Sequence, residues 1–196
     1  MTGSRSHCLA AMLLCAFGGN ARIRRCTSAV ALLAAVRLIS GPAAHAAVIE
    51  AKLRKPAPAF TLTDARGASV ALPAYKGKVV LLNFWATWCH GCQFEIPWFI
   101  EFQEKYRSAG LQVIGVSMDD DGWKSVRPYL ERKKLNYEVV IGSAALGKRY
   151  GLDSMPLSLL IDSEGKIADS HSGVVDRNAW EAEIRALLAG QKPFKP

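Results

Sequence analysis

Residues 79–92 read Val-Val-Leu-Leu-Asn-Phe-Trp-Ala-Thr-Trp-Cys-His-Gly-Cys. Val79–Trp85 is an apolar run rich in β-branched and aromatic residues, which is typical of a strand buried in a parallel sheet. Cys89 and Cys92 follow it closely, and apolar residues at helical spacing come next. The segment therefore predicts a buried strand, a Cys-x-x-Cys turn and a helix, which Pro97 is expected to kink.

The sequence on either side of this segment predicts a small α/β domain. Alternating apolar residues from Phe60 to Leu72, with a turn at Asp64–Gly67, are typical of a β-hairpin. The rest of the chain alternates short apolar runs with segments of helical periodicity. Strands are expected at Leu111–Met118, Tyr137–Ile141, Leu157–Ile161 and Ile167–His171, and helices at Trp123–Lys134, Ala144–Tyr150 and Arg177–Leu188.

Two loops carry acidic residues suited to cap the helices that follow them. Asp119–Gly122 precedes the helix that starts at Trp123, and Asp176 precedes the last helix. The order of strands and helices, with a hairpin near the end, indicates an α/β fold with a central mixed β-sheet flanked by helices.

The first 46 residues have the pattern of a targeting segment. Two short apolar runs, Cys8–Phe17 and Ala29–Val36, are separated by arginines, and the second is followed by Ala44-His45-Ala46. A basic flank, a short apolar core and an Ala-x-Ala end are typical of a secretory signal peptide. We therefore expect cleavage after Ala46 and a domain at residues 47–196.

Two other interpretations of the presequence stay open. Residues 1–46 could act as an uncleaved N-terminal membrane anchor, although neither apolar run reaches the ~18 residues that spanning requires. Arg24-Arg25 could belong to a twin-arginine signal. The long basic flank also leaves open a translation start downstream of Met1.

The positive charge lies mainly in this presequence. The whole chain carries a formal net charge of +8. The first 46 residues hold five arginines and no acidic residue, so residues 47–196 carry 20 Lys and Arg against 17 Asp and Glu, a net charge of +3. A nearly balanced domain needs no polyanionic partner, and we expect no nucleic-acid binding.

The cysteines point to chemistry rather than to a structural framework. Three of the five lie in the presequence, and the exported domain keeps Cys89 and Cys92, three positions apart. A small secreted domain held together by disulfides needs more cysteines, spread along the chain. At a helix N-terminus, backbone N–H groups and the helix dipole favour the thiolate of Cys89, which is the nucleophile, while Cys92 lies one turn deeper as the resolving thiol.

Two neighbours of the pair could tune its chemistry. Glu95 lies one turn beyond Cys92 on an apolar face, where burial would raise its pKa and suit it to exchange protons with Cys92; otherwise it is a solvated helix glutamate. His90, if protonated, would stabilise the Cys89 thiolate and make the protein more oxidising; otherwise it is a solvated imidazole.

Other roles for the pair are less consistent with the sequence. Structural zinc requires four ligands, and the exported domain offers Cys89, Cys92, His90 and His171, the last on a distant strand. Covalent haem attachment requires His directly after the second cysteine, where Gln93 stands. A purely structural disulfide would close too short a loop to add much stability. We expect no metal and no cofactor.

The segment Phe84–Cys92, with Glu95 and Pro97, resembles the thioredoxin superfamily and is most similar to TlpA/ResA-type extracytoplasmic thiol–disulfide oxidoreductases. The resemblance runs from about Pro56 to Leu188. Supporting stretches are Pro56–Leu62, Gly77–Trp85, Gly115–Asp119, Tyr150–Leu152 and Met155–Asp162.

The resemblance implies a thioredoxin fold with an N-terminal β-hairpin extension and a central insertion at Asp119–Lys134. It implies that Cys89 is the nucleophile, Cys92 the resolving thiol and Glu95 the acidic residue near it. Pro156 would be a cis-proline facing the disulfide, with the Met155 backbone binding the substrate peptide. Trp88, His90 and Gly91 would tune the redox potential.

Two residues depart from the family's pattern. The family often has Pro where Gly91 stands, which leaves the redox potential open. Many members have Thr, Val or Ala before the cis-proline, where Met155 stands, so the peptide-binding surface differs.

The resulting hypothesis is an extracytoplasmic protein-disulfide reductase. It would reduce client disulfides, including those of apocytochromes c by analogy, receive electrons from a membrane thiol donor, and act as a monomer. The alternatives are a periplasmic dithiol oxidase or isomerase, a peroxiredoxin-like peroxidase, and a non-catalytic peptide-binding module. For the peroxidase, Thr87 is out of register with the Pro-x-x-x-Thr-x-x-Cys pattern. The module would tolerate Cys89→Ser.

Overall fold

A five-stranded mixed sheet forms the centre of the domain, with strand order β5-β4-β3-β6-β7. The computed structural model describes residues 48–190, so the predictions for residues 1–46 lie outside the described part. β3 pairs in parallel with β4 and antiparallel with β6. The strands are β3 (Val79–Trp85), β4 (Leu111–Ser117), β5 (Glu138–Ile141), β6 (Leu157–Ile161) and β7 (Ile167–Ser172), and a separate hairpin consists of β1 (Thr61–Thr63) and β2 (Ser69–Ala71).

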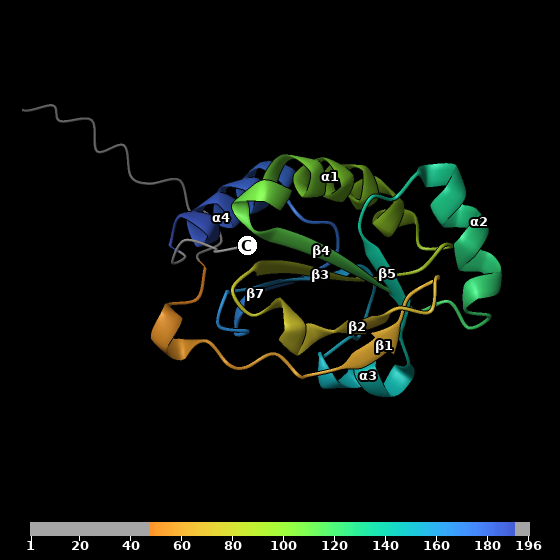
Figure 1. Ribbon diagram of the computed structural model, residues 1–196, viewed down its shortest axis with the longest axis horizontal. Coiled ribbons are helices and arrows are strands. Elements are labelled where there is room, and N and C mark those ends of the chain that lie inside the picture. The colour runs from red at the N-terminus through yellow and green to blue at the C-terminus, as the bar shows by residue number, and fades with distance from the viewer. Residues whose placement is uncertain (1–47, 191–196) are drawn as a thin grey trace, which may run out of the picture. The chain divides into compact units, whose positions relative to one another are not determined.

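The sheet is covered on both faces, as Figure 1 shows. Because successive side chains of a strand point to opposite faces, β3 contributes to two cores. Val79 and Leu81 belong to one apolar cluster and Leu82 and Phe84 to another. The first cluster packs under α1 (His90–Tyr106) and α4 (Arg177–Ala189), and the second under the β1–β2 hairpin and α3 (Ala144–Arg149).

Helix α2 (Trp123–Lys133) packs beside the redox pair rather than over the middle of the sheet. Its Val126 and Tyr129 are buried in a third apolar cluster that also contains Trp85, Cys89 and Cys92. The rings of Tyr129 and Trp85 lie 5.2 Å apart. This contact fixes which face of α2 is turned toward the cysteines.

The predicted elements are confirmed to within a residue or two at most ends. The cap on the last helix is also confirmed, because the Asp176 carboxylate accepts a hydrogen bond from the backbone N–H of Ala179 at 2.8 Å. The cap predicted from Asp119–Gly122 is wrong. The N-cap residue of α2 is Gly122, which makes no side-chain capping bond, and the Asp119 carboxylate turns inward to Thr87 instead.

Candidate active site

The redox pair stands where β3 gives way to α1. Cys89 is the N-cap residue of α1, and its Sγ accepts a hydrogen bond from the backbone N–H of Cys92 at 3.2 Å. The two cysteines form a disulfide with an S–S distance of 2.03 Å. Cys89 is 6% exposed and Cys92 is 0% exposed. The sulfur nearer to solvent is therefore that of Cys89, and backbone N–H groups at the helix end favour its thiolate.

Glu95 is fully buried one turn beyond Cys92. Its Oε1 accepts a hydrogen bond from the backbone N–H of Val175 at 2.8 Å, and its Oε2 has no hydrogen-bond partner within residues 48–190. Burial raises the pKa of Glu95 to about 7, although the Val175 N–H and the Ser158 hydroxyl favour the charged form. A carboxyl with such a pKa can gain and lose a proton near neutral pH.

The peptide bond between Met155 and Pro156 is cis, as the resemblance implies. Pro156 lies against the first turn of α1. A Cβ on Gly91 would come within 3.2 Å of both Pro156 Cδ and Val174 Cγ2. The structure therefore brings Gly91 and Pro156 into contact beside the disulfide, with no room to spare for a side chain at position 91.

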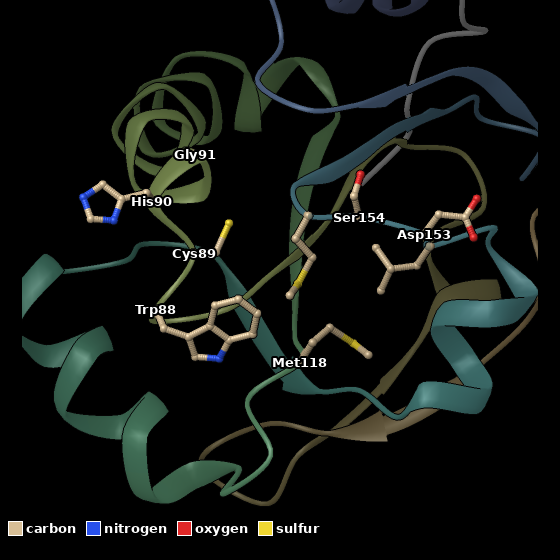
Figure 2. Close-up of a pocket in the computed structure, with 9 residues that line it drawn as sticks. Trp88, Cys89, His90, Gly91, Met118, Asp153 and Ser154 are labelled. Carbon is tan, nitrogen blue, oxygen red and sulfur yellow. The ribbon is translucent and has the colours of Figure 1, made fainter.

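A cavity of about 570 Å³ opens beside Cys89. Its walls include Trp88, Met118 and Met155, so thioether and aromatic surface dominates near the sulfur. Trp88 is 66% exposed. Figure 2 shows the imidazole of His90 pointing away from the Cys89 sulfur and from the cavity. Asp153 and Ser154 add polar groups to the cavity wall, and the ring of His90 points away from the cavity.

Met118 in the cavity wall and Asp119 beside the redox pair were not predicted as site residues from the sequence. The Asp119 carboxylate accepts hydrogen bonds from the Thr87 N–H at 3.0 Å, the Thr87 hydroxyl at 2.5 Å and the Ser117 hydroxyl at 2.8 Å. Gln93 donates to the Thr87 carbonyl at 3.0 Å from the other side. Asp119 therefore holds the segment that leads into Cys89. The Gly115–Asp119 motif was the available signal, but a loop aspartate before a helix suggested a cap instead.

Of the eight residues predicted for the site, Cys89 and Cys92 form the disulfide and Glu95 lies behind it. The other five line the cavity or lie against the first turn of α1: Trp88, His90, Gly91, Met155 and Pro156. Within residues 48–190, no cluster of three or more His, Cys, Asp and Glu side chains could hold a metal ion. No helix in that part of the chain is long and apolar enough to cross a bilayer. The site brings together the two sulfurs of Cys89 and Cys92 and the buried carboxyl of Glu95.

Solved structures with the same architecture define the class of protein. The chain superposes on a crystal structure from Chlorobium tepidum, described as a thiol:disulfide interchange protein DsbE, with a TM-score of 0.66 and 34% identity, covering 69% of this chain and 96% of that one. It also superposes on the pneumococcal exposed lipoprotein thioredoxin Etrx1 of Streptococcus pneumoniae, with a TM-score of 0.59 and 26% identity. This match covers 66% of this chain and 100% of that one. With its disulfide at a helix N-terminus, the chain is a thiol–disulfide oxidoreductase with a thioredoxin fold, as expected.

Its sequence relatives narrow the class to a family. The thiol-disulfide oxidoreductase ResA of Bacillus thuringiensis subsp. konkukian is 32% identical over 137 residues, which is 69% of this chain and 79% of that protein. The model of the AhpC/TSA family matches residues 53–170. The chain belongs to this family, and the similarity to ResA confirms the predicted resemblance.

Proposed function

We propose that the protein reduces disulfides of proteins outside the cytoplasm, with Cys89 as the nucleophile and Cys92 as the resolving thiol. The observation that carries this proposal is the difference between the two sulfurs. Cys89 lines the cavity of about 570 Å³, whereas Cys92 is fully buried behind it. An incoming disulfide can therefore reach one sulfur, and the other is held within bonding distance for the second step.

The reaction runs in two exchanges. The Cys89 thiolate attacks one sulfur of the client disulfide, so that the client S–S bond breaks, a mixed disulfide forms and one client thiolate leaves. Glu95 accepts the proton of Cys92, and the Cys92 thiolate then attacks Cys89 Sγ, which releases the second client thiolate. The client gains two electrons, the protein becomes the Cys89–Cys92 disulfide, and a thiol donor must return two electrons to it.

Binding of the client is assigned to the cavity wall. Met155 offers its backbone to an extended client peptide, and Pro156 packs against the turn that carries Gly91. The thioether and indole surfaces of Met118, Met155 and Trp88 suit apolar residues beside the client cysteine. Trp88 and Gly91 tune the redox potential in this proposal.

A reducing rather than oxidising direction is supported by the position of His90. A protonated imidazole close to the Cys89 sulfur would stabilise the thiolate and make the disulfide more oxidising. The ring of His90 is exposed and points away from that sulfur (Figure 2). Its effect on the thiolate is therefore screened by solvent.

The proposed location is outside the cytoplasm, with residues 1–46 as the export signal or membrane anchor and residues 47–196 as the catalytic domain. The signal-like pattern of residues 1–46 supports this location, as does the likeness to an exposed lipoprotein thioredoxin. A monomer that draws electrons from a membrane thiol donor, with apocytochromes c among its clients, completes the proposal.

A trapping experiment tests the reaction. In Cys92→Ser the second exchange is blocked, so client proteins should accumulate as mixed disulfides with Cys89, detected by mass spectrometry after non-reducing electrophoresis of the isolated envelope fraction. Cys89→Ser is the matched control and should trap nothing. Equal trapping by both variants, or by neither, would contradict the assignment.

A further inference from the structure

A second groove of about 630 Å³ lies beside the redox pair, on the side of helix α2. Trp88 and Gln93 line it from the active-site segment. Lys124, Arg132 and Lys133 line it from α2. None of the residues in its wall is acidic. The groove is therefore positively charged and adjoins the catalytic cysteine.

The packing of α2 determines which of its side chains are turned toward the redox pair. Arg132 and Lys133 follow Tyr129 by three and four positions, so they share its helix face. Lys124 lines the groove from the first turn of the helix. Tyr129 is buried against Trp85, with their ring centres 5.2 Å apart. The guanidinium of Arg132 lies 5.3 Å from the Tyr129 ring centre and the ammonium of Lys133 lies 5.9 Å from it.

The cations that line the groove differ in their pairing from several others in the domain. Within residues 48–190, no carboxylate forms an ion pair with Lys124, Arg132 or Lys133. Ion pairs elsewhere in the domain involve Lys52, Arg54, Arg66, Lys105, Lys166 and Arg177.

Trp88 connects this groove to the site of chemistry. Its side chain lines both the groove and the cavity that contains Cys89, and Figure 2 shows it extending from the segment that precedes the cysteine. A partner chain that presents a sulfur to Cys89 can therefore run across the indole and place its neighbouring residues among the cations.

We propose that this groove binds an acidic peptide segment adjoining the reactive cysteine pair of a partner protein. Charge complementarity carries the assignment, because opposite charges speed encounter and select among partners more than they add final affinity. The inference rests on the proposed thiol–disulfide exchange at Cys89, and it specifies that the partner in this exchange is acidic beside its cysteines.

The test uses three disulfide-bridged peptides that are identical except for three residues beside one cysteine, which are all aspartate, all serine or all lysine. The second-order rate constant for their reduction by the purified reduced protein is measured at low ionic strength. The aspartate peptide should react about tenfold faster than the serine peptide, since three charge pairs act together on the rate of encounter. The lysine peptide should react more slowly than the serine peptide.

Two comparisons assign the preference to the groove. In Lys124→Gln/Arg132→Gln/Lys133→Gln, the ratio of aspartate to serine rates should fall to about one. The control Lys55→Gln/Lys76→Gln/Arg185→Gln removes the same charge from exposed positions that line neither the groove nor the cavity, and it should keep the preference. In about 1 M salt, where the screening length is about 3 Å, the preference of the unmodified protein should largely vanish.

Equal rates for the three peptides, or the same loss in both triple variants, would overturn the acidic-partner inference while leaving the exchange reaction intact. Failure to reduce even the serine peptide would contradict the proposed function as well. A third outcome would also overturn the inference. The protein would show no peptide preference but would bind vesicles of anionic phospholipid, and only the groove variant would lose this binding. The cations would then be assigned to contact with a membrane surface.

Discussion

At the scale of single residues, the buried carboxyl of Glu95 makes the most direct kinetic prediction. With its pKa raised to about 7 by burial, it is protonated in acid and ionised in base. Because only the ionised form can accept the Cys92 proton, resolution of a mixed disulfide at Cys89 should accelerate as pH rises through about 7. Glu95→Gln should remove this pH dependence and slow the step by about 100-fold.

The measurement is the single-turnover release of a chromogenic thiol from its mixed disulfide with Cys89, followed from acid to alkaline pH. Glu101→Gln is a suitable control, because Glu101 is an exposed glutamate of the same helix that pairs with Arg177. An unchanged rate and pH profile in Glu95→Gln would show that Glu95 does not move the proton.

A second residue, Asp119, is predicted to hold the active-site segment in place. In Asp119→Ala, the N–H and hydroxyl of Thr87 and the hydroxyl of Ser117 lose their acceptor. We expect the free energy of unfolding to fall by about 2 kcal/mol, measured by urea titration, because buried donors left without partners are costly. Asp120→Ala removes the neighbouring exposed carboxylate and should change stability little; equal losses in both would contradict this role.

At the scale of elements, the N-cap of α4 can be tested in isolation from the chemistry. The Asp176 carboxylate accepts a hydrogen bond from the Ala179 N–H at 2.8 Å. Asp176→Ala should lower the free energy of unfolding by about 1 kcal/mol and leave the exchange rate unchanged, whereas Asp176→Asn should keep most of the stability. A loss of activity at unchanged stability would mean that the loop before α4 acts in the site.

The elements most easily predicted from sequence were those whose patterns are local. The apolar run Val79–Trp85 is the strand β3 as expected. The helical spacing of apolar residues after Cys89 was sufficient to predict α1. The capping aspartate at position 176 was sufficient to predict the start of α4. These signals depend on the neighbours of each residue along the chain.

Features that depend on tertiary contacts could not be predicted in this way. Asp119 binds Thr87, thirty-two positions earlier in the chain, and a loop aspartate in front of a helix looks the same whether it caps that helix or not. Likewise, Arg132 and Lys133 follow Tyr129 by three and four positions, and this spacing shows that the three residues share a helix face. Only the packing of Tyr129 on Trp85 shows that this face meets the redox pair.

At the scale of the whole molecule, two buried carboxyls make stability depend on pH. Burial raises the pKa of Glu95 to about 7, and burial together with the charge of Asp169 raises the pKa of Glu183 to about 7, both from 4.5. The folded state therefore keeps protons that the unfolded chain releases between pH 4.5 and about 7. This contribution to stability is complete below pH 4.5 and is lost as pH rises through about 7.

Each carboxyl should account for a loss of at most about 3 kcal/mol across this range. Urea unfolding of the oxidised protein at pH 5 and pH 8 measures the loss. In Glu95→Gln/Glu183→Gln the difference between the two pH values should shrink. If the free energy of unfolding of the double variant changed between pH 5 and pH 8 as much as that of the unmodified protein, other groups would be responsible for the pH dependence.

The reduction potential of the Cys89–Cys92 couple tests the central claim most directly. It is measured by equilibrating the purified protein with glutathione or dithiothreitol buffers and titrating the disulfide. A reductase should have a potential of about −270 mV or lower, in the range of thioredoxin. A potential of about −120 mV, typical of a strong periplasmic oxidant, would contradict the proposed direction of electron flow.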